Sequence, residues 1–201
     1  MQITKIESQV KNKGRYSIYI DGSFAVGISE RMLLEKQLVN GLELTASDVA
    51  ALKADSETDK LYGRTIDLLA RRPRSRWEIQ DYLKRKGAEQ GEIDAITNRL
   101  EKLNLLDDLD FANRWIESRR LLKPVSKRKL TQELKAKRIS DSVIHQALSL
   151  DETDDYSVLQ QEVVRKRRIS RYQDDQKLMQ YLARQGYSYD DIKRALTSEP
   201  S

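Results

Sequence analysis

The sequence predicts a mainly α-helical protein, built from tandem three-helix repeats behind a small β-rich N-terminal element. Apolar and polar residues alternate only in the first 44 residues, and a helical spacing of apolar residues follows. One helical motif also occurs three times, as "SRWEIQDYLKRKG", "SKRKLTQELKAKR" and "QDDQKLMQYLARQG". We therefore expect the β-rich element with a short helix over 1–44, and repeats over 45–107, 108–150 and 151–201.

The N-terminal element has the pattern of a short antiparallel meander. "ITKIESQV" and "RYSIYIDGSFAVGIS" alternate β-forming and polar residues, with "KNKG" and Asp21-Gly22 as turn signals. "ERMLLEKQL" predicts a brief helix after the strands, ended by Asn40-Gly41. This element is expected to cap the exposed end of the first helical repeat.

The repeat is defined by three equivalent leucines, Leu83, Leu134 and Leu182. Each has an apolar residue four positions earlier and an isoleucine ten positions later, which predicts the second and third helices of each unit. Ser75 with Glu78 forms a capping-box pattern, and Ser126 and Ser140 are candidate N-caps. The first helices are expected at "KLYGRTIDLLARR", "LDFANRWIESRRLL" and "DYSVLQQEVVRKRR".

The end of the second helix differs between the repeats. Gly87 and Gly186 suit a left-handed cap four residues after the reference leucine. Arg138 occupies this place in the second repeat and requires another way of ending the helix. Within that repeat, the spacing of Trp115 and Phe111 predicts that both face the interior.

Composition limits the class of protein. The chain has no cysteine, which excludes disulfides and thiolate metal sites and fits a reducing cytoplasm. No apolar run approaches the roughly 18 residues of a membrane span, and no export signal opens the chain. We expect a soluble, cytoplasmic monomer without a membrane partner.

Catalytic and metal-binding patterns are weak. His145 is the single histidine and has the spacing of a helix-surface residue. No glycine-rich phosphate loop or Ser-His-Asp set is present, so we expect no enzyme activity and no cofactor. Two groups of carboxylates are read as acidic first turns of helices rather than metal ligands: Asp107, Asp108, Asp110, and Asp151, Glu152, Asp154, Asp155.

Positive charge is concentrated in the middle of the chain. Residues 61–138 hold 20 Lys and Arg against 12 Asp and Glu, and the segments on either side are slightly acidic. The candidate binding residues in the first repeat are Arg71, Arg72, Arg74, Arg76, Lys84, Arg85 and Lys86. Those in the second repeat are Arg119, Arg120, Lys123, Lys127, Arg128 and Lys129. Stacked repeats would join the two clusters into one basic strip, whereas the alternative is a solvated face with cations near helix ends.

Such a strip fits phosphates or an acidic protein surface. Contacts of this kind depend on salt and are largely indifferent to base sequence. The units also look like helix-turn-helix motifs, which keeps duplex recognition open. The pattern leaves open whether Trp77 packs in the core or stacks on a base. Arg165 to Arg168 are a further basic run in acidic surroundings.

Four stretches carry a family resemblance: "LLARRPRSRWEIQDYLKRKG", "LEKLNLLDDLDFANRWIESR", "KPVSKRKLTQELKAKRIS" and the β-rich "KNKGRYSIYIDG". They resemble the RecX family, bacterial regulatory proteins of the RecA recombinase. The resemblance covers nearly the whole chain, although the third repeat lacks the proline and the serine cap. It implies a curved array of three-helix repeats that binds the RecA filament on single-stranded DNA. Single-stranded DNA would then be a partner either directly or through RecA. It also implies inhibition of strand exchange, ATP hydrolysis and the co-protease activity behind the SOS response.

The sequence and the resemblance together predict a non-enzymatic regulator in DNA repair and homologous recombination. The basic strip is expected to meet acidic RecA surface or nearby phosphate, and the sequence leaves open which of them. The competing interpretation is a stand-alone DNA-binding regulator of the helix-turn-helix kind.

Overall fold

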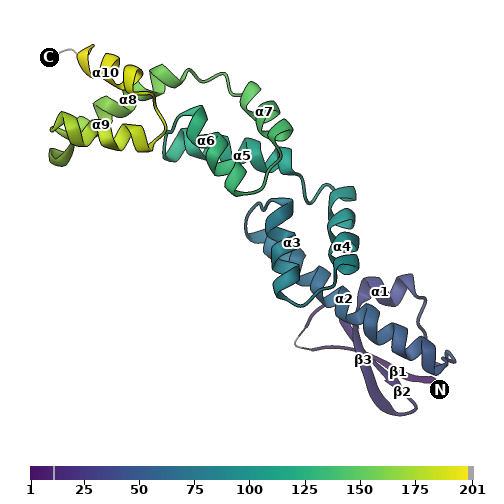
Figure 1. Ribbon diagram of the computed structural model, residues 1–201. Helices are drawn as coiled ribbons and strands as arrows, with labels where there is room; N and C mark the ends of the chain where they lie inside the picture. Colours follow the sequence, from purple (N-terminus) through teal and green to yellow (C-terminus); the bar gives the residue numbers. More distant parts are fainter. Residues whose placement is uncertain (11, 199–201) are drawn as a thin grey trace. The chain divides into compact units, whose positions relative to one another are not determined.

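The computed structural model describes residues 1–10 and 12–198. Lys11, in the first expected turn, and residues 199–201, at the end of the expected third repeat, lie outside it. In the described part, a three-stranded sheet is followed by helices (Figure 1). The predicted mainly α-helical fold with a β-rich beginning is confirmed. The chain forms two compact units, one of Met1–Pro73 with Ile79–Lys102 and one of Arg74–Glu78 with the chain from Leu103 onwards.

The sheet of the first unit is an antiparallel meander in the order β1, β2, β3. Its strands are β1 (Ile3–Ser8), β2 (Arg15–Ile20) and β3 (Ser23–Ser29). Asp21 and Gly22 form the second turn with φ of 47° and 81°, as the Asp-Gly pair predicts. The apolar face of the sheet is fully buried at Ile3, Ile18 and Ile28. Met32 of α1 (Glu30–Glu35) and Leu52 of α2 (Ala46–Arg71) complete this core.

Helix α2 begins at Ala46, well before the expected start at Lys60. Thr45 and Asp48 form a capping box that starts the helix there. The added turns pack against the sheet. The Ser56 hydroxyl donates to the carbonyl of Gly27 in β3 at 2.6 Å. Asp59 accepts hydrogen bonds from the amide and hydroxyl of Ser29 at 3.1 and 2.9 Å. The first helix of the first repeat therefore also holds the β-rich element.

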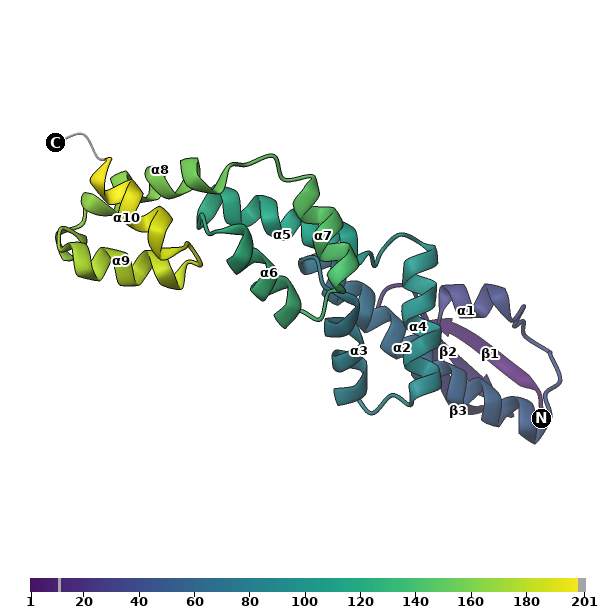
Figure 2. The same ribbon diagram turned by 45° about the horizontal axis from the view of Figure 1, so that its top comes forward.

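The remaining helices follow the predicted repeat (Figure 2). They are α3 (Arg76–Arg85), α4 (Gln90–Lys102), α5 (Asp108–Leu122), α6 (Lys127–Ala136), α7 (Asp141–Ser149), α8 (Asp155–Arg167), α9 (Asp175–Arg184) and α10 (Tyr189–Thr197). A short 3₁₀ turn, η1 (Ser170–Tyr172), lies between α8 and α9. The reference leucines Leu83, Leu134 and Leu182 are all 0% exposed. The repeat register read from the sequence is thus the register of the hydrophobic cores.

The caps show how the repeats differ. Ser75 and Glu78 form the expected reciprocal pair of hydrogen bonds, each at 3.3 Å. Gly87 and Gly186 adopt φ of 84° and 92°. Arg138 needs no other device to end its helix, because it adopts the left-handed conformation itself, with φ of 60°. This conformation is uncommon for a residue other than glycine.

Candidate interaction surface

A pair of hydrogen bonds links the segment before α3 to the second repeat within the second unit. The Ser75 hydroxyl donates to the carbonyl oxygen of Lys137 at 3.0 Å, at the end of α6. The amide of Arg76 donates to the Asp108 carboxylate at 2.7 Å, at the start of α5. Ser75 is 0% exposed. The serine therefore caps its own helix and also holds the next repeat.

The same pair of bonds joins the second repeat to the third. The Ser126 hydroxyl donates to the carbonyl of Gln185 at 3.2 Å, and the amide of Lys127 donates to the Asp155 carboxylate at 2.7 Å. Ser126 also caps α6, accepting the amide of Lys129 at 3.2 Å. Asp174 takes the equivalent place in the third repeat, where it caps α9 through its carboxylate. Its carboxylate accepts the amide of Lys177 at 2.9 Å.

We call the bonds of Ser75 and Arg76 the first linkage and those of Ser126 and Lys127 the second linkage. The second linkage brings the end of α9 against the start of α6. A Cβ added to Gly186 would lie 2.3 Å from the Ser126 hydroxyl and 2.9 Å from the Cβ of Lys129. Only glycine fits this approach. Arg184, two residues earlier, is therefore placed near Arg128 and Lys129.

Arg120, a predicted binding residue, is nearly buried and forms ion pairs within the protein. Its side chain is 12% exposed and pairs with Asp151 at 2.7 Å and Asp155 at 3.0 Å. It also donates to the carbonyl of Val125 at 2.7 Å. Burial opposes its charge, but the hydrogen bonds that it donates to the two carboxylates raise the pKa of Arg120. Arg120 is a structural cation at the second linkage.

Arg119 and Lys127 also make internal contacts. The Arg119 guanidinium pairs with Glu133 at 2.8 Å and lies 5.1 Å from the centre of the Trp115 ring. Glu133 accepts the indole N–H of Trp115 at 2.9 Å as well. Trp115 packs at the edge of the core and is only partly buried. Phe111 is 4% exposed, as predicted. The Lys127 ammonium donates to the carbonyl of Asp151 at 2.8 Å.

The side chains of the remaining predicted cations are either exposed or half-buried. Lys123, Arg128, Arg71, Arg72, Lys84, Arg85 and Lys86 are exposed, and Lys129, Arg74 and Arg76 are half-buried. Arg85 pairs with Asp81 at 2.9 Å but leaves 70% of its side chain exposed. Arg74 and Arg76 belong to the second unit, and Arg71, Arg72 and Lys84 to Lys86 belong to the first. The first cluster is therefore divided between the two units, and one continuous basic strip stays a prediction.

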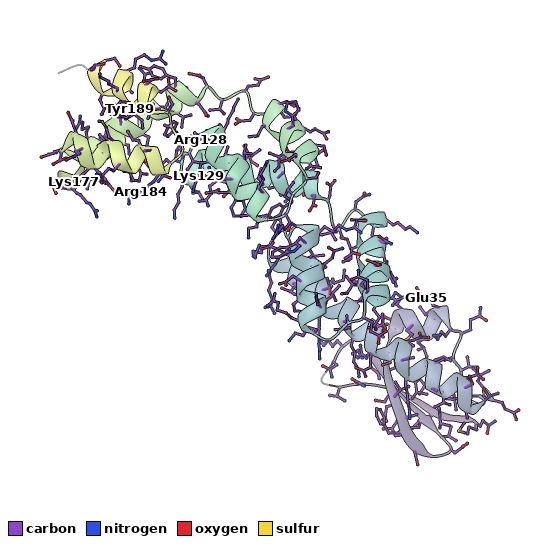
Figure 3. All side chains as sticks on the ribbon, viewed as in Figure 1. Glu35, Arg128, Lys129, Lys177, Arg184 and Tyr189 are labelled. Atoms are coloured by element: carbon purple, nitrogen blue, oxygen red, sulfur yellow. The ribbon has the colours of Figure 1, made fainter. Side chains whose placement is uncertain are left out.

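Two cations of the third repeat join Arg128 and Lys129, as Figure 3 shows along α6 and α9: Lys177 and Arg184. We call these four residues the α6–α9 basic surface. In the described structure the side chains of Arg128, Lys129 and Arg184 make no ion pair or hydrogen bond, while Lys177 is 4.0 Å from Asp174. The repeat register was a usable signal for them, because Lys177 is the equivalent of Lys129 and Arg184 the equivalent of Arg85.

The carboxylate groups cap helices and form ion pairs. Asp107 caps α5 by accepting the amides of Leu109 and Asp110 at 2.7 and 3.2 Å. Asp154 caps α8. In the second group, Asp151 and Asp155 bind Arg120, a role that the acidic first-turn interpretation missed. Within residues 1–10 and 12–198, no group of three or more His, Asp or Glu is arranged to hold a metal ion.

Two further residues that the sequence singled out lie at the surface. His145 is exposed on α7, and Trp77 is 41% exposed at the start of α3. Among the described helices, none combines the length and the apolar character needed to cross a bilayer.

Comparison with known proteins gives the family. Four family models match consecutive parts of the chain: the RecX N-terminal domain at 1–45, and the first, second and third RecX three-helix domains at 62–100, 107–148 and 152–196. The "Regulatory protein RecX" of Bacillus licheniformis is 32% identical over 96% of this chain and 76% of its own length. That of Bacillus subtilis is 30% identical over 96% of this chain and 75% of its own length.

Solved structures agree. A crystal structure of regulatory protein RecX superposes with a TM-score of 0.78 and 27% identity, covering 98% of this chain and 99% of that one. A RecX structure from Lactobacillus salivarius, with a TM-score of 0.60 and 24% identity, shares the fold over 72% of this chain and 96% of its own. The chain therefore belongs to the RecX family of regulatory proteins.

Proposed function

We propose that this protein regulates RecA by binding the RecA filament on single-stranded DNA and inhibiting its recombinase, ATPase and co-protease activities. The family supports a regulator of RecA, because the similar proteins are named regulatory proteins. The observation that carries the binding proposal is the α6–α9 basic surface, three of whose four cations have no side-chain partner in the described structure. The proposal treats the chain as a cytoplasmic monomer that acts without catalysis.

The chemistry of the α6–α9 basic surface favours charge recognition over base reading. Its side chains are lysine and arginine, which neutralise phosphates or pair with carboxylates. No Asn or Gln lies among the first three residues of α6, where a recognition helix presents groups to base edges. We therefore expect binding that weakens with salt and shows little preference for DNA sequence.

The exposed cations of the first cluster belong to the same proposal. Lys84, Arg85 and Lys86 close α3 and would supply a second contact region. Because charge contacts in separate regions add, reversing both groups should weaken binding more than reversing either group. Arg119, Arg120 and Lys127 are assigned structural roles instead.

The test is the rate of RecA ATP hydrolysis on single-stranded DNA with the protein added in substoichiometric amounts. We expect inhibition by the wild type and loss of inhibition for the combined variant R128E/K129E/R184E. K53E is the matched control, because Lys53 is an exposed cation of α2 with no side-chain partner in the described structure.

Binding to bare duplex and bare single strands is measured beside the ATPase rate. Inhibition without matching competition for bare DNA supports the proposal. Tight, selective duplex binding with an unchanged ATPase rate would favour the stand-alone DNA-binding regulator and overturn it.

A further inference from the structure

The second unit carries a groove between α5 and α7, two helices that pack directly on each other (Figure 2). Its volume is about 770 Å³. Both helices and the connection from α7 to α8 supply its lining, and the apolar lining residues are Ile116, Leu121, Ala147 and Leu150. None of these residues belongs to the α6–α9 basic surface.

Two large apolar side chains in this groove face solvent. Leu121 is 76% exposed and Leu150 is 65% exposed, whereas Ile116 and Ala147 are 5% and 2% exposed. Leu122, next to Leu121 in the chain, is 71% exposed. Single exposed leucines are ordinary, but two that border one groove form an apolar site of the kind that binds other proteins.

Two ion pairs neutralise part of the charge around the groove, and the charge that remains is negative. Arg114 pairs with Asp110 at 2.8 Å, and Arg120 pairs with Asp151 at 2.7 Å. Glu117 and Glu152 also line the groove, and neither makes a side-chain ion pair or hydrogen bond with any residue that the structure describes. The carboxyl ends of α5 and α7 lie beside Leu121 and Leu150 and add partial negative charge.

The third repeat does not reproduce this combination. With Asp108 and Asp155 as equivalent positions, Arg168 takes the place of Leu121. With Ile144 and Ile192 as equivalents, Ser198 takes the place of Leu150. The third repeat keeps the core positions while these two groove positions change, so the exposed leucines are not required by the repeat fold.

We propose that this groove docks a basic amphipathic segment of another protein. Apolar side chains of that segment would cover Leu121 and Leu150, and its lysines or arginines would pair with Glu117 and Glu152. The charge is opposite to that of the α6–α9 basic surface, so the two surfaces recognise different chemistry. This proposal does not depend on the proposed RecA regulation.

The test uses the full chain and a short fluorescein-labelled helical peptide of leucine and lysine, followed by fluorescence anisotropy. L121S/L150S should weaken binding by about tenfold or more, because each leucine loses apolar contact. E117Q/E152Q should weaken binding and reduce its dependence on salt. All four side chains are outside the cores, and circular dichroism checks that each variant stays folded.

Matched controls distinguish binding in the groove from nonspecific binding of the peptide. L34S removes a leucine that is 70% exposed on α1, and D190N removes an exposed carboxylate on α10. Unchanged binding by the controls, together with loss in both groove variants, supports the proposal. Equal loss in controls and groove variants, or no loss in the groove variants, overturns it.

A second copy of this chain is the other occupant that the test resolves. Sedimentation equilibrium of the wild type and of L121S/L150S measures self-association. A monomeric wild type supports the proposal, and an oligomer that the groove variant dissociates would overturn it.

Discussion

The two linkages in the second unit use the same bonds but tolerate different side chains beside them. Ser75 to Lys137 and Ser126 to Gln185 are equivalent hydrogen bonds of 3.0 and 3.2 Å. The residue after the accepting carbonyl is Arg138 at the first linkage and Gly186 at the second. A Cβ is accommodated at the first and would collide at the second. The repeated motif thus fixes which groups bond, while the neighbouring residues decide how closely the two repeats approach.

The charges that reinforce the linkages also differ. At the second, Arg120 is nearly buried between two carboxylates. At the first, the Lys137 ammonium pairs with Glu78 at 2.9 Å with 27% of the lysine side chain exposed. A buried pair leaves an uncompensated charge when one partner is lost, so the second linkage depends more strongly on its cation.

The largest expected effect is therefore at Arg120. R120M should lower the free energy of unfolding by about 3 kcal/mol or more, because Asp151 and Asp155 lose their partner. K137M should cost about 1 kcal/mol, as expected for a partly exposed pair. Urea unfolding of both variants measures the difference, and equal losses would remove the contrast between the linkages.

Gly186 gives the next largest effect. G186A should destabilise the protein by about 2 kcal/mol, because the added Cβ meets Ser126 and the backbone is left-handed. R138G at the first linkage should leave stability unchanged or raise it by up to about 1 kcal/mol. Thermal unfolding of the pair checks the prediction, which fails if R138G costs as much as G186A.

The serines come third. S75A and S126A should each lower stability by about 1 to 2 kcal/mol, because each loses a helix cap and a buried hydrogen bond to the next repeat. D174A should cost about 1 kcal/mol, because Asp174 only caps α9. A denaturant series on the three variants measures the ranking, and an equal loss for D174A would contradict the double role of the serines.

The smallest effect is on the pH dependence of stability. Burial of Asp151 opposes its charge, but hydrogen bonds from Arg120 and Thr153 lower its pKa from the ordinary value of an aspartate. The unfolded carboxyl titrates at about 3.9, so its stabilisation is complete above that pH and is lost as the pH falls through the lower folded value. Wild type should therefore lose its advantage over D151N as the pH drops below about 4. A constant difference between pH 3 and pH 7, in unfolding experiments at several pH values, would contradict this.

The sequence predicted the parts of the fold that depend on local pattern. The leucine register placed Leu83, Leu134 and Leu182 in the cores, and Asp21-Gly22 marked the hairpin. The start of α2 was missed, although its capping box at Thr45 is a local signal, because the helix extends back to pack on the sheet. The limits 1–44, 45–107, 108–150 and 151–201 stay a prediction.

The basic residues could be sorted only with tertiary structure. Arg120 pairs with carboxylates more than thirty residues away in the chain, at Asp151 and Asp155. Nothing in "ESRRLLK" distinguishes it from an exposed arginine. Arg184 joins Arg128 and Lys129 only because Gly186 permits the end of α9 to approach α6. Charge patterning locates a basic region, and packing decides which of its side chains remain available.

We propose that the α6–α9 basic surface carries the binding to RecA on DNA. It is tested most directly by the affinity of R128E/K129E/R184E for RecA assembled on labelled single-stranded DNA, measured at two salt concentrations beside wild type and K53E. We expect the combined variant to bind at least about tenfold more weakly at low salt and to show a flatter salt dependence, while K53E behaves as wild type. A folded variant that keeps wild-type affinity at both salt concentrations would contradict it.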